Sequence, residues 1–504
     1  MSRLFIFGIG GTGARVIKAL TFLLSAGVDI KATEIVPILL DPDSGNGDLQ
    51  RAEEALKNYQ RIRKVVKESI KTDKIDFFKA DLKTLDELAV NQNESSNRIA
   101  SGFRFQLKNV QGDRFRDYID HGSLDEKNQD FINLLFSQKN LDLDMEVGFK
   151  GNPNIGSVVL NQFKNSDEFK YFATSFNQND RIFIISSIFG GTGASGFPLL
   201  LKNIREADVT LPNFKNLQDA RIGAVTVLPY FGVAPDEKSE INMGTFLSKT
   251  KAALSYYERN ISNNKSLNAM YYIGDTSENS YANHEGSTNQ KNDAHFVEVA
   301  SALAIVDFMN IDDSYMTTVN KRATEVYYKE FGLNKPIGAN GIQFLDMGIS
   351  TQKIIKSQLT RYMYFNLYLR DEIENALNKN AHPWLKDGNN KITKSFLTSP
   401  FYEFITIYNS LFSSWLVELS RNKKSFSPFN LGVNGSNLFQ LLSGIEPNKK
   451  IFDTFKSDNY DLFNGKLNES LKAIGDLPVE QKFMGLFSQA TKKLINEKFA
   501  NMES

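Results

Sequence analysis

The chain has no cysteine among its 504 residues, and this absence excludes several kinds of chemistry. Without a thiol there is no disulfide framework, no thiol nucleophile, no cysteine-ligated zinc and no iron–sulfur cluster. Histidine is scarce too, and the four residues show no spacing typical of metal ligands: His121, His284, His295 and His382. A chain without cysteine suits a reducing compartment, so we predict a cytoplasmic location.

Long apolar runs and an excess of one charge are also missing. A bilayer-spanning helix needs about 18 to 20 apolar residues, and no run approaches that length. The N-terminal apolar segment is interrupted by glycines, Arg15 and Lys18, where a signal peptide would be continuously apolar. The 59 basic and 59 acidic residues cancel, whereas nucleic-acid and membrane binders need a basic face. We therefore expect neither a membrane nor nucleic acid as a direct partner.

Two glycine-rich loops are present, each between a predicted strand and a predicted helix. The apolar runs Leu4–Phe7 and Arg181–Ile188 lead into them. Glycine lets the backbone approach a phosphate closely, and the helix that follows presents free N–H groups to it. The first loop also satisfies the dinucleotide fingerprint GxGxxG, and neither loop carries the lysine of GxxxxGK[ST]. The predicted phosphate-binding residues are Gly10, Gly11, Thr12, Gly13, Gly190, Gly191, Thr192 and Gly193.

Further apolar runs predict a parallel α/β sheet. Ile35–Leu40, Arg221–Leu228 and Ala269–Ile273 read as buried strands. Asp41 and Asp43 directly follow the first of these, at the edge where open α/β sheets bind ligands. Their carboxylates could hold a ribose hydroxyl or a cation, with Asp43 binding the metal through water.

The remaining chain divides into a charged insertion and a helical end. We interpret residues of about 48–148 as an elaboration outside the core sheet. Beyond residue 350 the pattern is almost wholly helical, with segments near Gln352–Leu377, Ser395–Leu419 and Glu469–Phe499. The prediction is a nucleotide-binding domain over 1–350 and a helical C-terminal domain over 351–504.

The glycine motifs resemble those of the tubulin and FtsZ superfamily of GTPases. Residues 189–196, FGGTGASG, are similar to the tubulin signature [SAG]GGTG[SA]G, and residues 10–13 match the first glycine loop of FtsZ. Residues 41–43 fall where the family has an Asn/Asp-bearing loop, and residues 151–156, GNPNIG, resemble FtsZ's Gly-Asn-Pro-Glu-x-Gly loop. The four matches occur in the family's order. They imply a parallel tubulin/FtsZ-like, Rossmann-like GTPase domain.

The resemblance also implies ligands and their contacts. GTP or GDP with Mg²⁺ would be bound, and Asn152 would contact the terminal phosphate. The loop after the fifth strand would contact the ribose, which indicates Glu237. The start of the central helix would hold the guanine, which indicates Asn292, Asp293 or Glu298. An ordinary helix cap is the alternative role for Asn292.

Two departures from the family leave hydrolysis and assembly open. The family completes catalysis with an NxDxxD-type loop that enters the next subunit's site, and here only Asp312 and Asp346 are imperfect substitutes. The family's β-rich second domain is replaced by helices, which predict self-association or a protein partner. The pattern looks most like divergent prokaryotic tubulin-like proteins whose GTPase domain is fused to other modules.

Two other functions stay open. An NAD- or FAD-dependent enzyme would use GxGxxG with Asp41 on the adenosine ribose, although that leaves the second loop unexplained. A scaffold protein would bind nucleotide without hydrolysing it, and the missing NxDxxD match favours this alternative.

Overall fold

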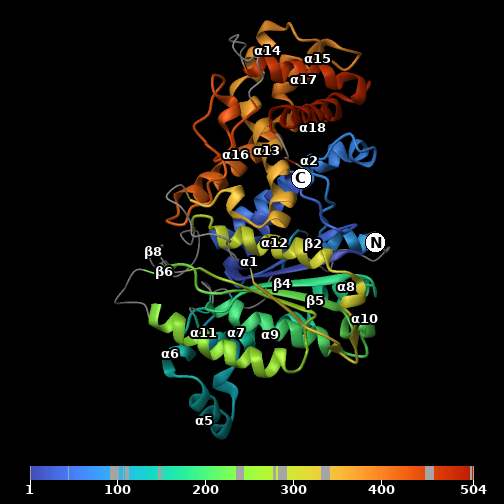
Figure 1. Cartoon of the computed structure of the whole chain (residues 1–504). Helices are drawn as coiled ribbons and strands as arrows, with labels where there is room; N and C mark the ends of the chain where they lie inside the picture. The colour runs from blue at the N-terminus through green and yellow to red at the C-terminus, as the bar shows by residue number, and fades with distance from the viewer. Residues whose placement is uncertain are drawn as a thin grey trace.

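The computed structural model places the sheet domain below a stack of helices (Figure 1). Most of the upper helices are orange to red and so come from the C-terminal part of the chain, and one blue helix from near the N-terminus lies beside them (Figure 1). The structure describes residues 2–43, 45–90, 102–105, 107, 110, 113–145, 149, 151–233, 243–275, 280–281, 292–330, 341–448, 459–499 and 502.

A parallel sheet of seven strands forms the centre of the lower part. Its order is β11-β7-β5-β4-β1-β2-β3, and each neighbouring pair is parallel. The strands are β1 (Leu4–Ile9), β2 (Ile35–Leu40), β3 (Arg104–Phe105), β4 (Arg181–Ser187), β5 (Arg221–Val227), β7 (Ala269–Ile273) and β11 (Tyr327–Glu330). β1, β2 and β4 are buried along their whole length, which explains their continuous apolar sequences.

Helices cover both faces of the sheet. In Figure 1, α1 (Gly10–Ser25) and α12 (Phe296–Asn310) lie above it, whereas α7 (Pro153–Leu160), α9 (Gly191–Arg205) and α11 (Met243–Tyr257) lie below it. Parallel strands need such crossover helices, and helices on both faces bury the sheet. The predicted α/β fold class is confirmed.

The insertion differs from the interpretation of residues of about 48–148 as an elaboration outside the core sheet, because one of its segments is a strand of that sheet. Its first helix, α2 (Gly47–Lys71), packs against α1, and β3 joins the edge of the sheet beside β2. A separate small core holds the later part, with Phe115, Phe136 and Met145 buried against α7. The short helices of the sheet domain are α3 (Leu85–Val90), α4 (Phe115–Tyr118), α5 (Glu126–Leu135), α6 (Gln138–Leu141), α8 (Asp167–Ser175) and α10 (Phe214–Gln218).

Small two-stranded sheets complete the sheet domain. β6 pairs with β8 in parallel, and β9 pairs with β10 in the antiparallel direction. Their bounds are β6 (Gly232–Val233), β8 (Ser280–Tyr281), β9 (Thr318–Val319) and β10 (Arg322–Ala323).

The C-terminal region is helical, as predicted. The segment expected over 469–499 is two helices, because Gly475 at φ +70° ends the first and Pro478 precedes the second. The helices are α13 (Ile349–Asp371), α14 (Ile373–Lys379), α15 (Pro383–Lys386), α16 (Pro400–Arg421), α17 (Asn459–Ile474) and α18 (Val479–Lys498).

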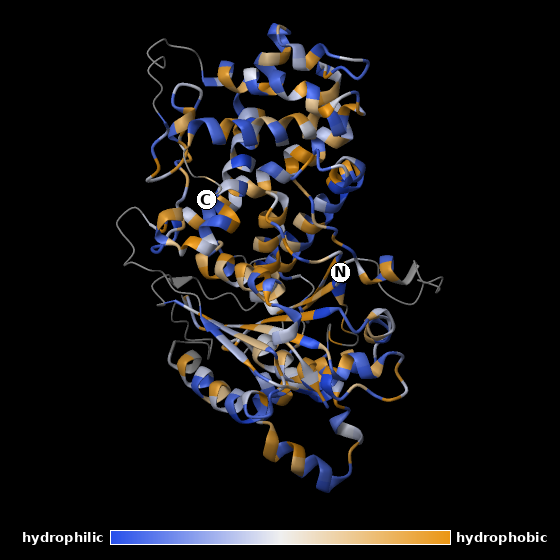
Figure 2. Ribbon diagram, turned by 45° about the vertical axis from the view of Figure 1, so that its right-hand side comes forward, coloured by the Kyte–Doolittle hydropathy of each residue, from blue (hydrophilic) through white to orange (hydrophobic). Residues whose placement is uncertain are grey.

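The helical region and the sheet domain share one apolar core. Phe22 of α1 packs against Tyr408, Phe412 and Trp415 of α16, with ring centroids 5.1 to 5.7 Å apart. α2 also contacts α16 and α18. Figure 2 shows apolar segments along the inner sides of the helices as well as in the sheet. The frequent aromatic residues beyond position 350 therefore serve packing, and the domain boundary near residue 350 stays a prediction.

Within the described residues, no helix is long and apolar enough to cross a membrane.

Candidate functional site

The two predicted glycine loops lie against each other at the carboxyl ends of β1 and β4. α1 begins at Gly10 and α9 at Gly191. Gly10 has φ +72°, a backbone conformation that favours glycine. A Cβ atom at Gly10 would lie 3.6 Å from the Thr192 Cβ and 3.8 Å from the Gly193 nitrogen. Residues 182 and 183 positions apart in the sequence thus meet at one edge of the sheet.

A third turn, at Gly151 and Asn152, touches the second loop. Asn152 is the residue before α7, and Pro153 occupies the first turn of that helix, where its missing N–H has no cost. A Cβ atom at Gly191 would lie 3.0 Å from the Gly151 nitrogen and 3.2 Å from the Asn152 nitrogen. We name these three segments, residues 10–13, 151–152 and 190–193, the glycine turns.

Close packing of the glycine turns against the strands requires glycine at the last position of two turns. A Cβ atom at Gly13 would lie 2.7 Å from the Gly8 Cα of β1, and one at Gly193 would lie 2.6 Å from the Ser187 carbonyl oxygen of β4. The helices can therefore start directly at the strand ends. The first N–H groups of α1, α7 and α9 converge on one region, an arrangement that suits a polyphosphate.

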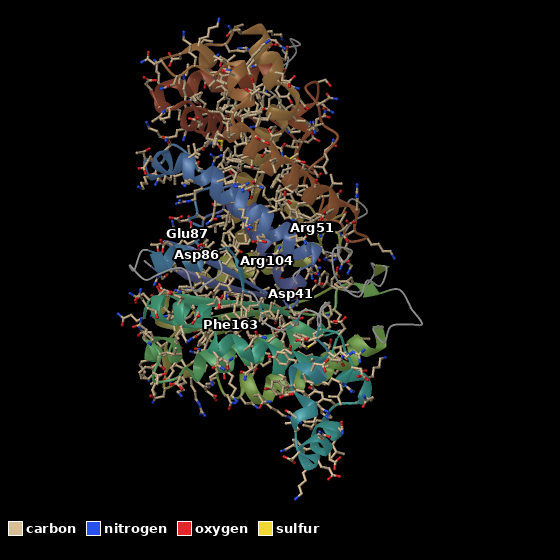
Figure 3. The ribbon with its side chains drawn as sticks, turned by 180° about the vertical axis from the view of Figure 1, so that it is seen from behind. Asp41, Arg51, Asp86, Glu87, Arg104 and Phe163 are labelled. Carbon is tan, nitrogen blue, oxygen red and sulfur yellow. The ribbon has the colours of Figure 1, made fainter. Side chains whose placement is uncertain are left out.

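The acidic loop after β2 lies beside the first glycine turn. Asn46 caps α2 by accepting the Asp48 and Leu49 N–H groups, and its Nδ2 lies 3.4 Å from the position of a Gly11 Cβ. The Asp41 carboxylate accepts the Asp43 N–H at 3.0 Å. Figure 3 shows Asp41 on the same side of the molecule as Arg51 and Arg104.

The environment of Asp41 favours its protonated form. Burial raises the pKa of Asp41 to about 7, and the negative charges of Asp43 and Asp48 act in the same direction. The hydrogen bond from the Asp43 N–H and the charge of Arg104 oppose this rise.

The described residues contain no group of three or more His, Cys, Asp or Glu that could hold a metal ion. Magnesium is often held by one or two carboxylates together with substrate phosphates, so Asp41 and Asp43 have suitable chemistry. The water-mediated metal contact of Asp43 stays a prediction.

A buried network of charges lies next to the first glycine turn. Arg15 is 3% exposed and pairs with Asp48 at 2.5 Å and with Glu298 at 2.7 Å; these carboxylates are 0% and 1% exposed. Tyr230 accepts from Arg15 and donates to Glu298. Burial raises the pKa of Glu298, while Arg15 and Lys18 oppose that rise.

This network extends to the helical region through Glu418 of α16. Arg51 of α2 pairs with both Asp48 and Glu418, and Lys18 of α1 lies 3.5 Å from Glu418. The Glu418 carboxylate also accepts the Ala294 N–H ahead of α12. Charged contacts therefore join α1 to α2, α12 and α16.

The start of α12 lies within this network. His295, and not Asn292, caps the helix by accepting the Val297 N–H, so a helix cap is not the role of Asn292. Burial lowers the pKa of His295 to about 4. The Asn292 carbonyl accepts from Arg51 at 2.7 Å, which places this residue near the network. Its guanine contact stays a prediction, and Glu237 lies outside the described residues.

The two predicted catalytic carboxylates belong to two different turns, one after α12 and one before α13. Asp312 is an exposed residue just after α12, and its neighbour Asp313 pairs with Arg181, the first residue of β4. Asp312 is thus at the amino ends of the strands, opposite the turns. Asp346 accepts the Gln343 N–H in a short turn before α13. The catalytic role of Asp312 and Asp346 stays a prediction.

Three residues of the site, Arg15, Asp48 and Lys249, lie outside the sequence motifs. Arg15 and Asp48 belong to no motif, but a charged residue within the apolar pattern of α1 indicates that a buried partner is needed. Lys249 of α11 gives no such signal. Its Nζ donates to the Gly151 carbonyl at 2.6 Å and so supplies a cation at the glycine turns.

No family model and no curated protein matches the chain. Similar solved structures include CetZ2 from Haloferax volcanii, a GTPγS-bound protofilament, at 12% identity and a TM-score of 0.30 over 62% of this chain and 61% of CetZ2. FtsZ from M. jannaschii matches at 14% identity and 0.27, over 54% of this chain and 46% of FtsZ. The TubZ-Bt filament matches at 12% and 0.26, over 62% and 54%. The chain therefore aligns with less than two thirds of each of these proteins.

The order of elements agrees with the resemblance in the sequence motifs. The glycine loops follow the strands β1 and β4 of one parallel sheet, the Gly-Asn-Pro turn precedes α7, and a buried central helix follows β7. The chain has a parallel α/β fold in which the glycine loops and the central helix occur in the order that the sequence motifs predict.

Proposed function

We propose that the protein binds a guanine nucleotide, GTP or GDP, at the glycine turns. The observation that carries this proposal is the contact between three turns that are distant in the sequence. A Cβ atom at Gly191 would lie in tight contact with the Gly151 backbone, 3.0 Å from its nitrogen, and Gly10 lies against Thr192. Backbone N–H groups from three helix starts would bind the phosphates, with the hydroxyls of Thr12 and Thr192 beside them.

The same observation disfavours an NAD- or FAD-dependent enzyme. A dinucleotide fingerprint needs one glycine loop at the start of one helix. It gives no reason for a second glycine-threonine loop to meet the first, or for the Gly151 turn to meet the second. A nucleoside di- or triphosphate accounts for all three, and the resemblance of residues 189–196 to the tubulin signature favours guanine.

Mg²⁺ would bind beside the phosphates. Asp41 and Asp43 would hold it, Asp43 through water, and the metal would neutralise phosphate charge. Ionising Asp41 for this role would require the cation to offset the burial that favours its protonated form.

Hydrolysis, if it occurs, would need a second copy of the chain. Asp312 lies at the opposite edge of the sheet from the glycine turns, so it can approach a nucleotide only in a neighbouring molecule. We propose head-to-tail self-association for this reason, in the cytoplasm, with the helical region available to a protein partner. A scaffold that binds GTP without turnover is the second candidate, because the sequence lacks a match to the NxDxxD-type loop.

Substitution of Gly191 tests the site. Gly191→Val places a branched side chain against Gly151 and Asn152 and should weaken GTP binding at least about tenfold. Gly465→Ala is the matched control, because no atom lies within 4 Å of its Cβ position in α17. Both variants should keep the far-UV circular dichroism of the parent. A folded Gly191→Val protein that retains GTP affinity would exclude the glycine turns as the site.

A further inference from the structure

Lys249 is a cation next to the glycine turns that no motif indicates. It lies on α11, and its Nζ donates to the Gly151 carbonyl at 2.6 Å. The Nζ is also 3.2 Å from the position that a Gly151 Cβ would take. The Gly151 and Asn152 nitrogens in turn face Gly191 of the second glycine loop. Only the Gly151 turn therefore lies between the Lys249 ammonium group and that loop.

The glycine turns form a row with two different ends. Residues 10–13 contact residues 190–193, and these contact residues 151–152, so the second loop lies in the middle. Aromatic rings gather beside the first two of these segments: the Tyr230 hydroxyl accepts from Arg15 of α1, and Phe231 lies 5.6 Å between ring centroids from Phe189, which precedes the second loop. Lys249 lies at the other end.

Charge sets the direction in which a nucleotide would lie along this row. A terminal phosphate carries more negative charge than an internal one, about −1.5 to −2 at neutral pH. It gains most beside an ammonium group, whereas a base and ribose suit the aromatic end. A triphosphate therefore extends toward Lys249, and a diphosphate ends one phosphate short of it.

We propose that Lys249 contacts the terminal phosphate and makes the site selective for a nucleoside triphosphate over a diphosphate. This inference rests on the proposed nucleotide binding. Lys249 supplies the charge that the lysine of a GxxxxGK[ST] loop would otherwise supply, but from a helix below the sheet. It is a specificity-determining residue, and the step it affects is binding.

Lys249→Gln tests the charge while preserving a hydrogen-bond donor for the Gly151 carbonyl. Dissociation constants for GTPγS and GDP are measured on the full chain with Mg²⁺. The parent should prefer GTPγS, and the variant should lose about tenfold to a hundredfold in GTPγS affinity with a change in GDP affinity of less than about threefold. Lys249→Arg should keep the preference, and Lys251→Gln, an exposed lysine on the same helix, is the matched control.

The outcomes separate this inference from the proposed function. If the parent binds GTPγS and Lys249→Gln keeps the same ratio of GTPγS to GDP affinity, the selectivity role is wrong and nucleotide binding stands. Equal losses for both nucleotides would indicate a structural role and would also overturn it. If the parent binds neither nucleotide, the proposed function itself fails and the inference fails with it. Should Lys249→Gln not fold, loss of the preference in folded Lys249→Arg would contradict the inference.

Discussion

Removing Arg15 should destabilise the protein strongly, because it leaves two buried carboxylates with fewer positive partners. In Arg15→Met, Asp48 keeps Arg51, whereas Glu298 keeps only the Tyr230 hydroxyl, the His295 N–H and the more distant charge of Lys18. Removal of one partner from a buried ion pair lowers the free energy of unfolding by about 3 to 5 kcal/mol. We expect a loss near the lower end of that range, since Asp48 is still paired.

The pH dependence of this loss identifies its cause. Without Arg15 the pKa of Glu298 in the native state should rise further above its ordinary value. A carboxyl group with a raised native pKa takes up a proton on folding, so its stability contribution is lost as the pH rises. The deficit of Arg15→Met should therefore be larger at about pH 8 than at about pH 5.

Urea denaturation, followed by circular dichroism, measures the effect. Lys57→Met is the matched control, because Lys57 is half exposed and pairs with Glu53 on the surface of α2. It should cost less than about 1 kcal/mol. Combining Arg15→Met with Glu298→Gln should recover part of the loss, since the unpaired charge is gone. A cost for Arg15→Met no larger than that of the control would refute the role of the buried network.

Two further predictions concern single carboxylates. Because the pKa of Asp41 is raised to about 7 in the native state, stability should fall as the pH rises from about 4 to 7, by up to about 4 kcal/mol from this group. Asp41→Asn should flatten that fall in denaturation midpoints measured across the range, and an unchanged slope would contradict the assignment. For Asp312, which is exposed at the edge opposite the glycine turns, Asp312→Asn should leave GTP affinity unchanged and reduce turnover about a hundredfold if neighbouring chains complete the site. Parent turnover per molecule should then rise with protein concentration, and turnover independent of concentration would exclude this role.

The strands were the most predictable part of the fold. β2 and β7 have the predicted bounds, Ile35–Leu40 and Ala269–Ile273, because buried parallel strands are short apolar runs bounded by polar or turn residues. The division of the last helical segment at Gly475 was missed, since helical periodicity continues across a break of a few residues. The break occurs because Gly475 adopts a left-handed backbone conformation, φ +70°, which ends the first of the two helices.

The sequence predicts those parts of the candidate site whose residues are contiguous in the chain. The glycine loops are contiguous motifs, so residues alone indicate them. The pair of Arg15 and Glu298 joins positions 283 residues apart, and Lys249 reaches Gly151 across 98 residues. No spacing rule predicts such pairs, because they depend on how α1, α12 and α11 pack. A buried arginine in an apolar helix predicts that a partner exists but does not identify it.

Equilibrium binding of labelled GTP with Mg²⁺, competed separately by unlabelled GTP, ATP and NAD, tests the central claim most directly. Because the glycine turns and the tubulin-like motifs favour a guanine nucleotide, unlabelled GTP should displace the label, and ATP and NAD should not at comparable concentrations. Displacement by NAD, or no binding of GTP by folded protein, would contradict the account.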